Sequence, residues 1–330
     1  MKRVTVAIPC RADEPSLGLV VDEVMANCRR AAFWGRTAIE LLVCVNGAQR
    51  RRDARPIETF RERCRAHGMP LEEVWLCGEP TPAPATPDAA LSARLFVTGI
   101  GGKARAWNLL RAAAAGDPMF VCDADVTFSP DAFSRLYDGL CADPDLVLYT
   151  PKTDCRHEGR VLERIVAAPY RLDFPNLSGQ LYVMCSRRAP RRMPEDLIEP
   201  ERWLELEAGP ERVGRDPLAR VYVRLTTTLP DFFRQRVRIE MGKIQLQREY
   251  AGLLARSRPQ PRLRAVWSRP PSERAALVAY LGLRTVAHGW AWWEYRRRGL
   301  EAVWRQARTT KRWDARAAER TEGLRDPAAR

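Results

Sequence analysis

Met119-Phe120-Val121-Cys122-Asp123-Ala124-Asp125 is the stretch from which the fold can be worked out. Four consecutive apolar residues without helical spacing predict a buried strand. Alternate residues of a strand point to the same face, so Asp123 and Asp125 at its end would direct two carboxylates to one point beyond the sheet. Carboxylate oxygens suit Mg²⁺ or Mn²⁺, which commonly join one or two carboxylates to substrate phosphates. The alternative for this tripeptide alone is a solvated turn after the strand.

Outward from this stretch, short apolar segments alternate with segments of helical spacing. Strands are predicted at residues 4–8, 39–45 and 74–77, and helices at residues 18–32, 57–67 and 104–115. Because each strand is apolar throughout, the pattern predicts an α/β fold with a mostly parallel, Rossmann-like sheet that helices cover on both faces. Ligands of such sheets bind beyond the carboxyl ends of the strands. Pro9, Asn46 and Asp123 lie at three of these ends, so we expect them to meet in one crevice.

The second half of the chain is less regular. Strand-like runs occur at residues 146–149 and 180–184, and residues 195–250 look mostly helical and polar. Prolines predict a loop at residues 81–87 and a linker at residues 256–261. We therefore expect two parts, an α/β domain over residues 1–250 and a C-terminal helical extension over residues 251–330.

The net charge of +14 is concentrated in the extension. Residues 251–330 hold 18 Lys and Arg against 7 Asp and Glu, and they also hold six of the ten tryptophans. A nearly neutral body with a basic, tryptophan-rich tail predicts an anionic partner for the tail, either membrane lipid or nucleic acid. The tail matches no known nucleic-acid-binding module, so we expect an anionic membrane surface and no nucleic acid.

Cysteine usage and the N-terminus both bear on location. The nine cysteines include no Cys-x-x-Cys pair, and several lie inside apolar runs. This usage fits a reducing cytosol and argues against a disulfide framework or structural zinc. The apolar run at the N-terminus is too short for a signal-peptide core, so we expect a cytoplasmic protein.

Seven short polar motifs occur in order along residues 1–250. The first strand leads into a proline, an arginine and an acid, and the second strand ends in an amide: Pro9, Arg11, Glu14 and Asn46. Next come Gly101-Gly102-Lys103, with Asn108 in the helix that follows, and then the pair Asp123 and Asp125. The last three motifs are Ser178-Gly179-Gln180, Pro194-Glu195-Asp196 and Gln235-Arg236-Val237-Arg238-Ile239. Together they resemble the GT-A-type, family-2 inverting glycosyltransferases.

The resemblance implies a metal-dependent enzyme that moves a sugar, with inversion, from a UDP- or GDP-sugar to an acceptor hydroxyl. It implies Mn²⁺ or Mg²⁺ on Asp123 and Asp125, and Asp196 as the catalytic base with Glu195 beside it. The implied donor-binding residues are Pro9, Arg11, Glu14, Asn46, Lys103, Asp123, Gln235, Arg236 and Arg238. Two positions depart from the family pattern. Asn46 replaces the usual acid near the nucleobase, and Ile239 replaces the tryptophan of processive members, which argues against a processive synthase.

The same residues suit this chemistry on physical grounds. A departing nucleoside diphosphate carries negative charge, which a divalent ion on the two aspartates would stabilise. Lys103 lies at a glycine-rich helix start, where backbone N–H groups and the helix dipole favour phosphate. The attacking hydroxyl must lose its proton, and this requires a positioned carboxylate such as Asp196.

Each motif also has a purely structural interpretation. Lys103 can be an ordinary lysine at a helix start, and Glu195 with Asp196 can complement a helix dipole. Asn46 can cap a turn, and the polar residues 235–238 can form a solvated helix face. Two other classes of function stay open. One is a nucleotidyltransferase, which would bind a nucleoside triphosphate, and the other is a nucleic-acid-binding protein that acts through the basic tail.

Residues 275–293 form the most apolar stretch, and their length is about what crosses a bilayer. Arg284, His288 and two glycines within the stretch disfavour a span. Nearby tryptophans and the cluster Arg296–Arg298 favour a helix that lies on an anionic membrane surface. The alternative is a helix that packs on the catalytic domain with its tryptophans in the core. If the helix lies on the membrane, we expect a peripheral protein of the cytoplasmic face, with a lipid-linked or membrane-proximal acceptor.

Overall fold

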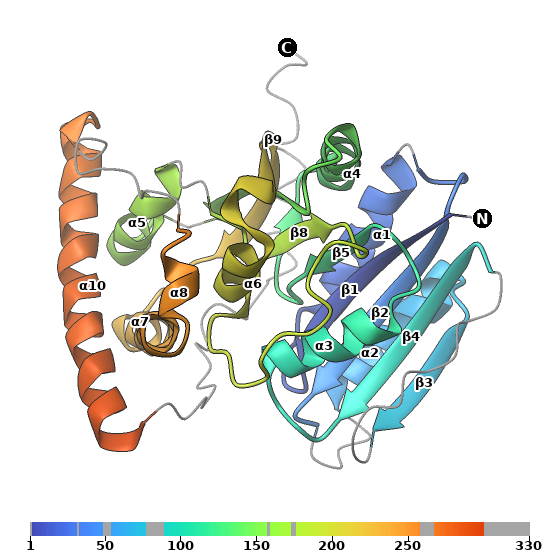
Figure 1. Ribbon diagram of the computed structural model, residues 1–330, viewed down its shortest axis with the longest axis horizontal. Coiled ribbons are helices and arrows are strands. Elements are labelled where there is room, and N and C mark those ends of the chain that lie inside the picture. The colour runs from blue at the N-terminus through green and yellow to red at the C-terminus, as the bar shows by residue number, and fades with distance from the viewer. Residues whose placement is uncertain are drawn as a thin grey trace.

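One sheet organises the protein (Figure 1). The computed structural model describes residues 2–31, 33–48, 54–76, 89–156, 159–172, 176–257 and 267–299. Within these residues, nine strands pair in the order β3-β4-β2-β1-β5-β8-β7-β9-β6. Their bounds are β1 (Arg3–Arg11), β2 (Ala38–Asn46), β3 (Leu71–Leu76), β4 (Leu91–Thr98), β5 (Met119–Cys122), β6 (Thr127–Phe128), β7 (Leu148–Arg156), β8 (Leu181–Met184) and β9 (Val213–Arg224).

The half of the sheet from β3 to β5 is parallel, and the other half is mixed. β1 runs parallel to β2 and β5, and β4 runs parallel to β2 and β3. β8 is antiparallel to both of its neighbours, and β6 is antiparallel to β9, whereas β7 and β9 are parallel. The predicted α/β fold with a mostly parallel sheet is therefore confirmed. Cys77, at the end of the predicted third strand, lies outside the described residues.

Helices cover the two faces of the sheet, as the alternation of strands and helices predicts. Their bounds are α1 (Leu17–Arg30), α2 (Arg55–His67), α3 (Lys103–Ala113), α4 (Ala132–Ala142), α5 (Val161–Ala167), α6 (Pro200–Ala208), α7 (Leu229–Glu249), α8 (Ala251–Leu254) and α10 (Pro271–Arg298), with short 3₁₀ turns η1 (Ala168–Arg171) and η2 (Pro210–Arg212). The predicted helices at residues 18–32, 57–67 and 104–115 correspond to α1, α2 and α3.

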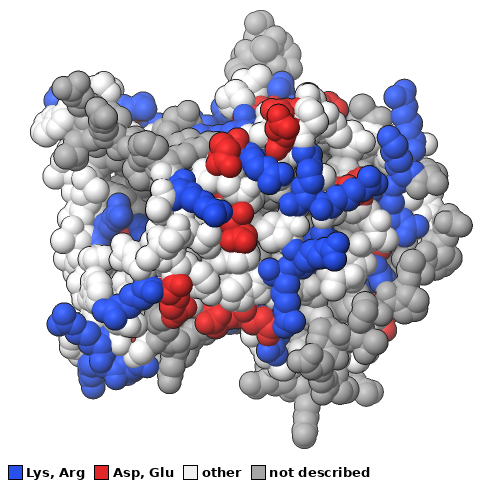
Figure 2. Space-filling model, viewed as in Figure 1, with Lys and Arg blue, Asp and Glu red and all other residues white. Residues whose placement is uncertain are grey.

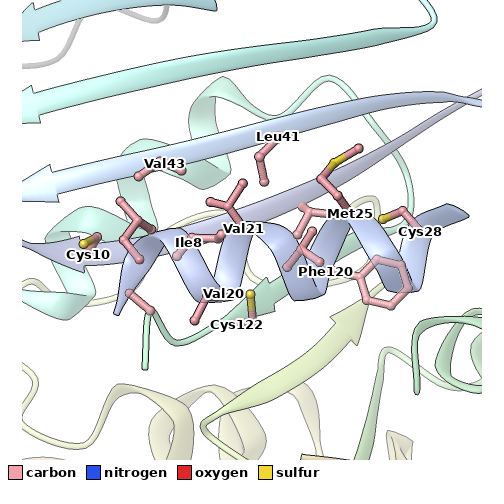
Figure 3. Packing of buried hydrophobic residues seen from close by; sticks show 14 of the residues in the cluster. Ile8, Cys10, Val20, Val21, Met25, Cys28, Leu41, Val43, Phe120 and Cys122 are labelled. Carbon is pink, nitrogen blue, oxygen red and sulfur yellow. The ribbon is translucent and has the colours of Figure 1, made fainter. Parts of the chain in front are cut away.

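Two hydrophobic cores lie on opposite faces of the sheet because strand side chains alternate. In β2, Leu41 and Val43 belong to one core, and Leu42 and Cys44 belong to the other. Figure 3 shows α1 lying along the first of these faces, with Val21 turned toward the strands. Each fully buried Val or Leu side chain contributes about 1.5–3 kcal/mol relative to an exposed one, so these cores stabilise the sheet whose strand ends carry the polar residues.

Two strands differ from the sequence prediction: β4 is not predicted, and β9 lies in a segment predicted to be mostly helical. No strand is predicted at residues 91–98, yet these residues form β4. Arg94 of β4 can be fully buried because it pairs with Glu40 of β2 at 2.7 Å. Residues 195–250 are predicted as mostly helical, and this is wrong for β9. Pro217 interrupts the apolar pattern of β9, and the pairing of β9 with β7 shifts register around it.

The C-terminal helix α10 packs along the outside of the molecule against α7 and α5 (Figure 1). Its inner side buries Leu277, Tyr280 and Ala287, whereas Trp290 and Trp293 are exposed. Packing on the body, one of the alternatives from the sequence, therefore describes its inner side, although Trp290 and Trp293 are not in the core as that alternative expected. In the described part of the chain, none of the helices combines the length and apolarity that a membrane span requires. Most of the predicted linker, and all residues after 299, lie outside the described residues.

Candidate active site

A cleft of about 930 Å³ opens where the carboxyl ends of β1, β2 and β5 meet. Ligand pockets in proteins typically measure about 300–1,000 Å³, so this cleft lies at the upper end of the usual range. Every site residue predicted from the sequence lines this cleft except Glu195 and Asp196. The expectation that Pro9, Asn46 and Asp123 meet in one crevice is confirmed.

Asn46 joins three elements at one side of the cleft. Its side-chain N–H donates to the carbonyl of Cys10 at 2.8 Å, and its Oδ1 accepts the backbone N–H of Gly102 at 3.3 Å. Gly102 has a φ of 138°, which a residue with a side chain rarely adopts. Asn46 thus fixes the start of α3 to the end of β1 while it also lines the cleft.

Arg11 and Glu14 follow β1 on the same side of the cleft. The guanidinium of Arg11 pairs with Asp13 at 2.9 Å. The Glu14 carboxylate is buried and accepts the backbone N–H of Ser16 at 3.2 Å. Both side chains are therefore held in place by neighbours close in the sequence.

Lys103, the first residue of α3, lies between two carboxylates. Its Nζ is 2.6 Å from Asp123 Oδ1 and 2.5 Å from Glu201 Oε1, and it donates to the carbonyl of Gly179 at 3.2 Å. Burial alone would lower the pKa of Lys103, but the two carboxylates raise it above its ordinary value. Lys103 therefore stays charged, and the alternative of an ordinary solvated lysine does not describe it.

Three acidic side chains gather at the end of β5. Asp123 lies beside Asp125 and Glu201, and its carboxylate contacts Lys103. Burial, and then the charges of Asp125 and Glu201, raise the pKa of Asp123 in spite of Lys103. Among the described residues, no three His, Cys, Asp or Glu side chains are placed to hold a metal ion by themselves. A cation here would need further oxygen ligands from a substrate.

The predicted pair Glu195 and Asp196 lies outside the cleft lining. Glu195 forms ion pairs with Arg105 at 2.5 Å and with Arg192 at 2.9 Å. Asp196 is exposed, and its backbone carbonyl accepts the side-chain N–H of Gln245. The physical reason is that α6 begins only at Pro200, so residues 195 and 196 belong to the preceding loop.

Glu199 and Glu201, which flank Pro200 at the start of α6, line the cleft instead. Burial, the largest cause, raises the pKa of Glu199, while nearby Arg238 lowers it and Glu201 raises it. The Glu199 side chain packs so closely on α7 that a Cβ added to Gly242 would lie 2.2 Å from its Cγ. Glycine at position 242 therefore leaves room for this carboxylate.

Helix α7 brings Gln235, Arg236, Arg238 and Ile239 to the cleft. The guanidinium of Arg236 donates to Glu240 through two N–H groups, at 2.6 and 3.0 Å. The side chains are thus part of the cleft wall, and the alternative of a solvated helix face does not describe this side of α7.

Comparison with known proteins agrees with this geometry. Residues 85–191 match glycosyl transferase family 2. This segment of the chain is therefore similar to family-2 glycosyltransferases. Among solved structures, the mannosyltransferase PcManGT from Pyrobaculum calidifontis, in complex with GDP-Man and Mn²⁺, aligns with a TM-score of 0.52 and 16% identity over 98% of this chain and 79% of its own. S. aureus TarS aligns with a TM-score of 0.43 and 12% identity over 89% of this chain and 55% of its own. No curated protein sequence matches the chain.

Two elements of the site lie within the segment that matches the family model. Residues 85–191 contain Lys103 and both aspartates that follow β5, whereas Glu199, Glu201 and all of α7 lie beyond them. The likeness to the mannosyltransferase supports the GT-A fold of the whole described chain. The acids of α6 carried a signal in the sequence, because proline favours the first position of a helix and acids favour its first turn.

Proposed function

We propose that this glycosyltransferase moves a sugar from a nucleotide-sugar donor to an acceptor hydroxyl, with inversion and with the help of a divalent metal ion. The observation that carries the proposal is the gathering of three acidic side chains, Asp123, Asp125 and Glu201, near Lys103 at the end of β5. Carboxylates close together are costly unless a cation offsets their repulsion. A divalent ion supplies that charge.

The residues at this position fit Mn²⁺ or Mg²⁺. Asp123 and Asp125 would hold the ion through carboxylate oxygens, which hard divalent cations prefer. Such ions usually take one or two carboxylates and complete their coordination with substrate phosphates, in keeping with the small number of acids here. When bound, the ion would stabilise the negative charge of the departing nucleoside diphosphate. The Mn²⁺ in the mannosyltransferase complex supports this assignment.

Lys103 and the strand ends supply the remaining donor contacts in this proposal. Lys103 holds its ammonium group at the N-terminus of α3, where backbone N–H groups and the helix dipole also favour phosphate. Pro9, Arg11 and Asn46 line the cleft beside β1 and β2, where the nucleoside would lie. The panel described below distinguishes a uridine from a guanosine nucleotide, because Asn46 stands where the family usually has an acid near the nucleobase.

We assign the proton-accepting role to Glu199. It lines the cleft, and no hydrogen bond or ion pair within the described residues occupies its carboxylate. Its raised pKa also suits a general base, because efficiency increases as the pKa approaches the working pH. The acceptor oxygen would bond to the anomeric carbon as its proton passes to Glu199 and the nucleoside diphosphate leaves. One displacement of this kind inverts the anomeric centre. Asp196, the residue predicted from the sequence, is the alternative.

We further propose that α10 rests on an anionic membrane surface and brings the enzyme to a membrane-proximal acceptor. Val278, Val286 and Trp293 are exposed and recur at spacings that put them on one side of the helix. Gly282 and Gly289, on the same side, have no neighbouring atoms within reach of an added Cβ. The helix ends in Arg296–Arg298, and each basic residue near an anionic surface contributes about 1 kcal/mol.

The proposed reaction is tested by measuring thermal stability and donor hydrolysis with a panel of nucleotides. UDP- and GDP-sugars are each added with Mn²⁺, with Mg²⁺ or with a chelator, and nucleoside triphosphates serve as a parallel series. A donor at 100 times its Kd should stabilise the protein by about 2.7 kcal/mol, and only when metal is present. Stabilisation by a nucleoside triphosphate but by none of the nucleotide sugars would favour a nucleotidyltransferase and reject the proposal.

A further inference from the structure

Four basic side chains converge on one buried carboxylate between α7 and α10. Glu240 of α7 is only 1% exposed. From α7 it accepts hydrogen bonds from Arg236 at 2.6 Å and Lys243 at 2.8 Å. From α10, Arg284 donates to it at 3.2 Å, and His288 lies 3.2 Å away. Counted without His288, this cluster of Glu240 and its three cations carries an excess of two positive charges. The neighbouring Glu199 and Arg238 have opposite charges, so together they leave this excess unchanged.

The excess charge faces the cleft. Arg236, Lys243 and Arg284 all line it, whereas Glu240 lies behind them. Their side chains are 15%, 36% and 43% exposed, so water screens them only in part. The crowding of positive charge acts on Lys243, because burial and then the charge of Arg236 lower its pKa to about 8 even though Glu240 raises it. One cation would be enough to pair Glu240 and tie α10 to α7, so a structural role leaves the other two unexplained.

We propose that the α7–α10 end of the cleft binds a phosphate group carried by the acceptor. This inference rests on the proposed function and extends it to the substrate class. A phosphate monoester carries about 1.5 to 2 negative charges at neutral pH, which matches the excess of the cluster. Arg236 and Arg284 offer planar N–H donors suited to phosphate oxygens, and Lys243 offers a compact charge.

The position of the cluster favours the acceptor over the donor. Pro9 and Asn46 mark the nucleotide side at the ends of β1 and β2, whereas α10 lies at the far side of the molecule from those strands (Figure 1). The donor diphosphate is assigned to the end of β5, next to Lys103. Arg236, which the family resemblance places among the donor-binding residues, is therefore reassigned here to the acceptor. The charge distribution of the cleft therefore provides one place for the donor phosphates and a second place for another anion.

Apolar side chains lie beside the cluster. Ile239 of α7 and Tyr280 and Leu281 of α10 line the same end of the cleft. A phosphate that carries an apolar chain would find both parts of its structure matched there. A small soluble phosphate shares the same anionic group, so the experiment must separate these two sources.

Calorimetric titration of the full chain with defined probes tests the proposal. Glycerol 3-phosphate, farnesyl phosphate and farnesol are titrated separately, with farnesyl phosphate below its micelle concentration. Both phosphates should bind and farnesol should not bind comparably. Tighter binding of farnesyl phosphate would identify a lipid phosphate, and equal binding would identify a soluble one. Arg284→Gln and Lys243→Gln should each weaken phosphate binding at least about tenfold, because each removes a charged hydrogen-bond donor.

The matched control is Arg296→Gln, which removes one positive charge from the same helix outside the cleft lining. It should leave binding of the phosphate probes unchanged. Arg284→Lys keeps the positive charge next to Glu240, so it should retain most of the affinity for the phosphate probes. Because this variant also keeps the ion pair between α10 and α7, it helps to separate the loss of a phosphate ligand from a loosened α10. Thermal melting of each variant supplies the same check.

Two results would overturn the subsite. If wild-type protein bound a nucleoside diphosphate with Mn²⁺ but neither phosphate probe, the subsite would be refuted while the proposed reaction stood. If Arg284→Gln weakened nucleoside diphosphate binding as strongly as phosphate binding, the cluster would belong to the donor. Failure to bind both nucleotide and phosphate would instead reject the proposed function and the subsite together.

Discussion

Replacing Glu240 by glutamine should destabilise the protein by about 3 kcal/mol at neutral pH. Burial raises the pKa of Glu240, but hydrogen bonds and charges from Lys243 and Arg236 lower it overall, from the ordinary 4.5 to about 2. A difference of about 2.5 pKa units corresponds to about 3 kcal/mol of folding free energy. Breaking a buried charge network by removing one partner typically costs about 3–5 kcal/mol, which agrees.

The pH dependence of this effect follows from the sign of the shift. The pKa of Glu240 is lower in the folded protein than in the unfolded chain, so its stabilisation is fully present above about pH 4.5 and is lost as the pH falls toward 2. Protonated glutamic acid and glutamine are nearly isosteric and both neutral. The difference in unfolding free energy between wild type and Glu240→Gln should therefore shrink to less than half by about pH 3.

Urea unfolding followed by circular dichroism, at several pH values between 7 and 3, measures this difference. Glu294→Gln on α10 is the matched control, since Glu294 lies 3.8 Å from the exposed Arg298. Exposed ion pairs contribute only about 0–1 kcal/mol, so the control should unfold close to wild type. Equal urea midpoints for wild type and Glu240→Gln at pH 7, or a difference that stayed constant down to pH 3, would refute the reasoning.

The remaining predictions concern the metal, the base and the membrane. Asp125→Asn should abolish transfer and metal-dependent binding of nucleoside diphosphate without changing the thermal melting point much; normal turnover of this variant in chelator would remove the metal from that site. Glu199→Gln should keep donor affinity but lower kcat by about 10²–10⁴-fold, whereas Asp196→Asn should change kcat little. The opposite ranking in single-turnover assays would restore Asp196 as the base. Replacing Arg296–Arg298 by glutamate should release the protein from anionic liposomes while activity on a soluble acceptor persists; wild-type protein that ignores such liposomes at low salt would contradict the membrane assignment.

The first half of the fold was predictable because its signals are local. β1, β2 and β5 are continuous apolar runs, and a run that is buried on both faces shows its strand character directly in the sequence. β4 and β9 were not predictable in this way. The Arg94 charge in β4 is neutralised by Glu40, which lies 54 residues earlier, and such a pairing exists only in the folded chain.

In the candidate site, too, the residues with local signals were predictable and the others were not. Lys103, Asp123 and Asp125 follow from a helix start and a strand end, each readable within a few residues. Choosing between two neighbouring acidic segments required the structure, because residues 195–196 and residues 199–201 both combine a proline with acids. Only the start of α6 at Pro200 decides which of them lines the cleft.

Acidic side chains gather at one end of the cleft and basic side chains at the other, and Glu199 lies within the field of both. Glu201 at the acidic end raises its pKa after burial does, whereas Arg238 and Lys243 on α7 lower it. A cation bound at the end of β5 would offset part of the first effect, and an anion bound between α7 and α10 would offset part of the second. On the proposed assignments, an occupied anion subsite therefore makes Glu199 a stronger proton acceptor. Acceptor binding would then help to prepare the base that acts on the acceptor, which ties the charge pattern of the cleft to the order of events in transfer.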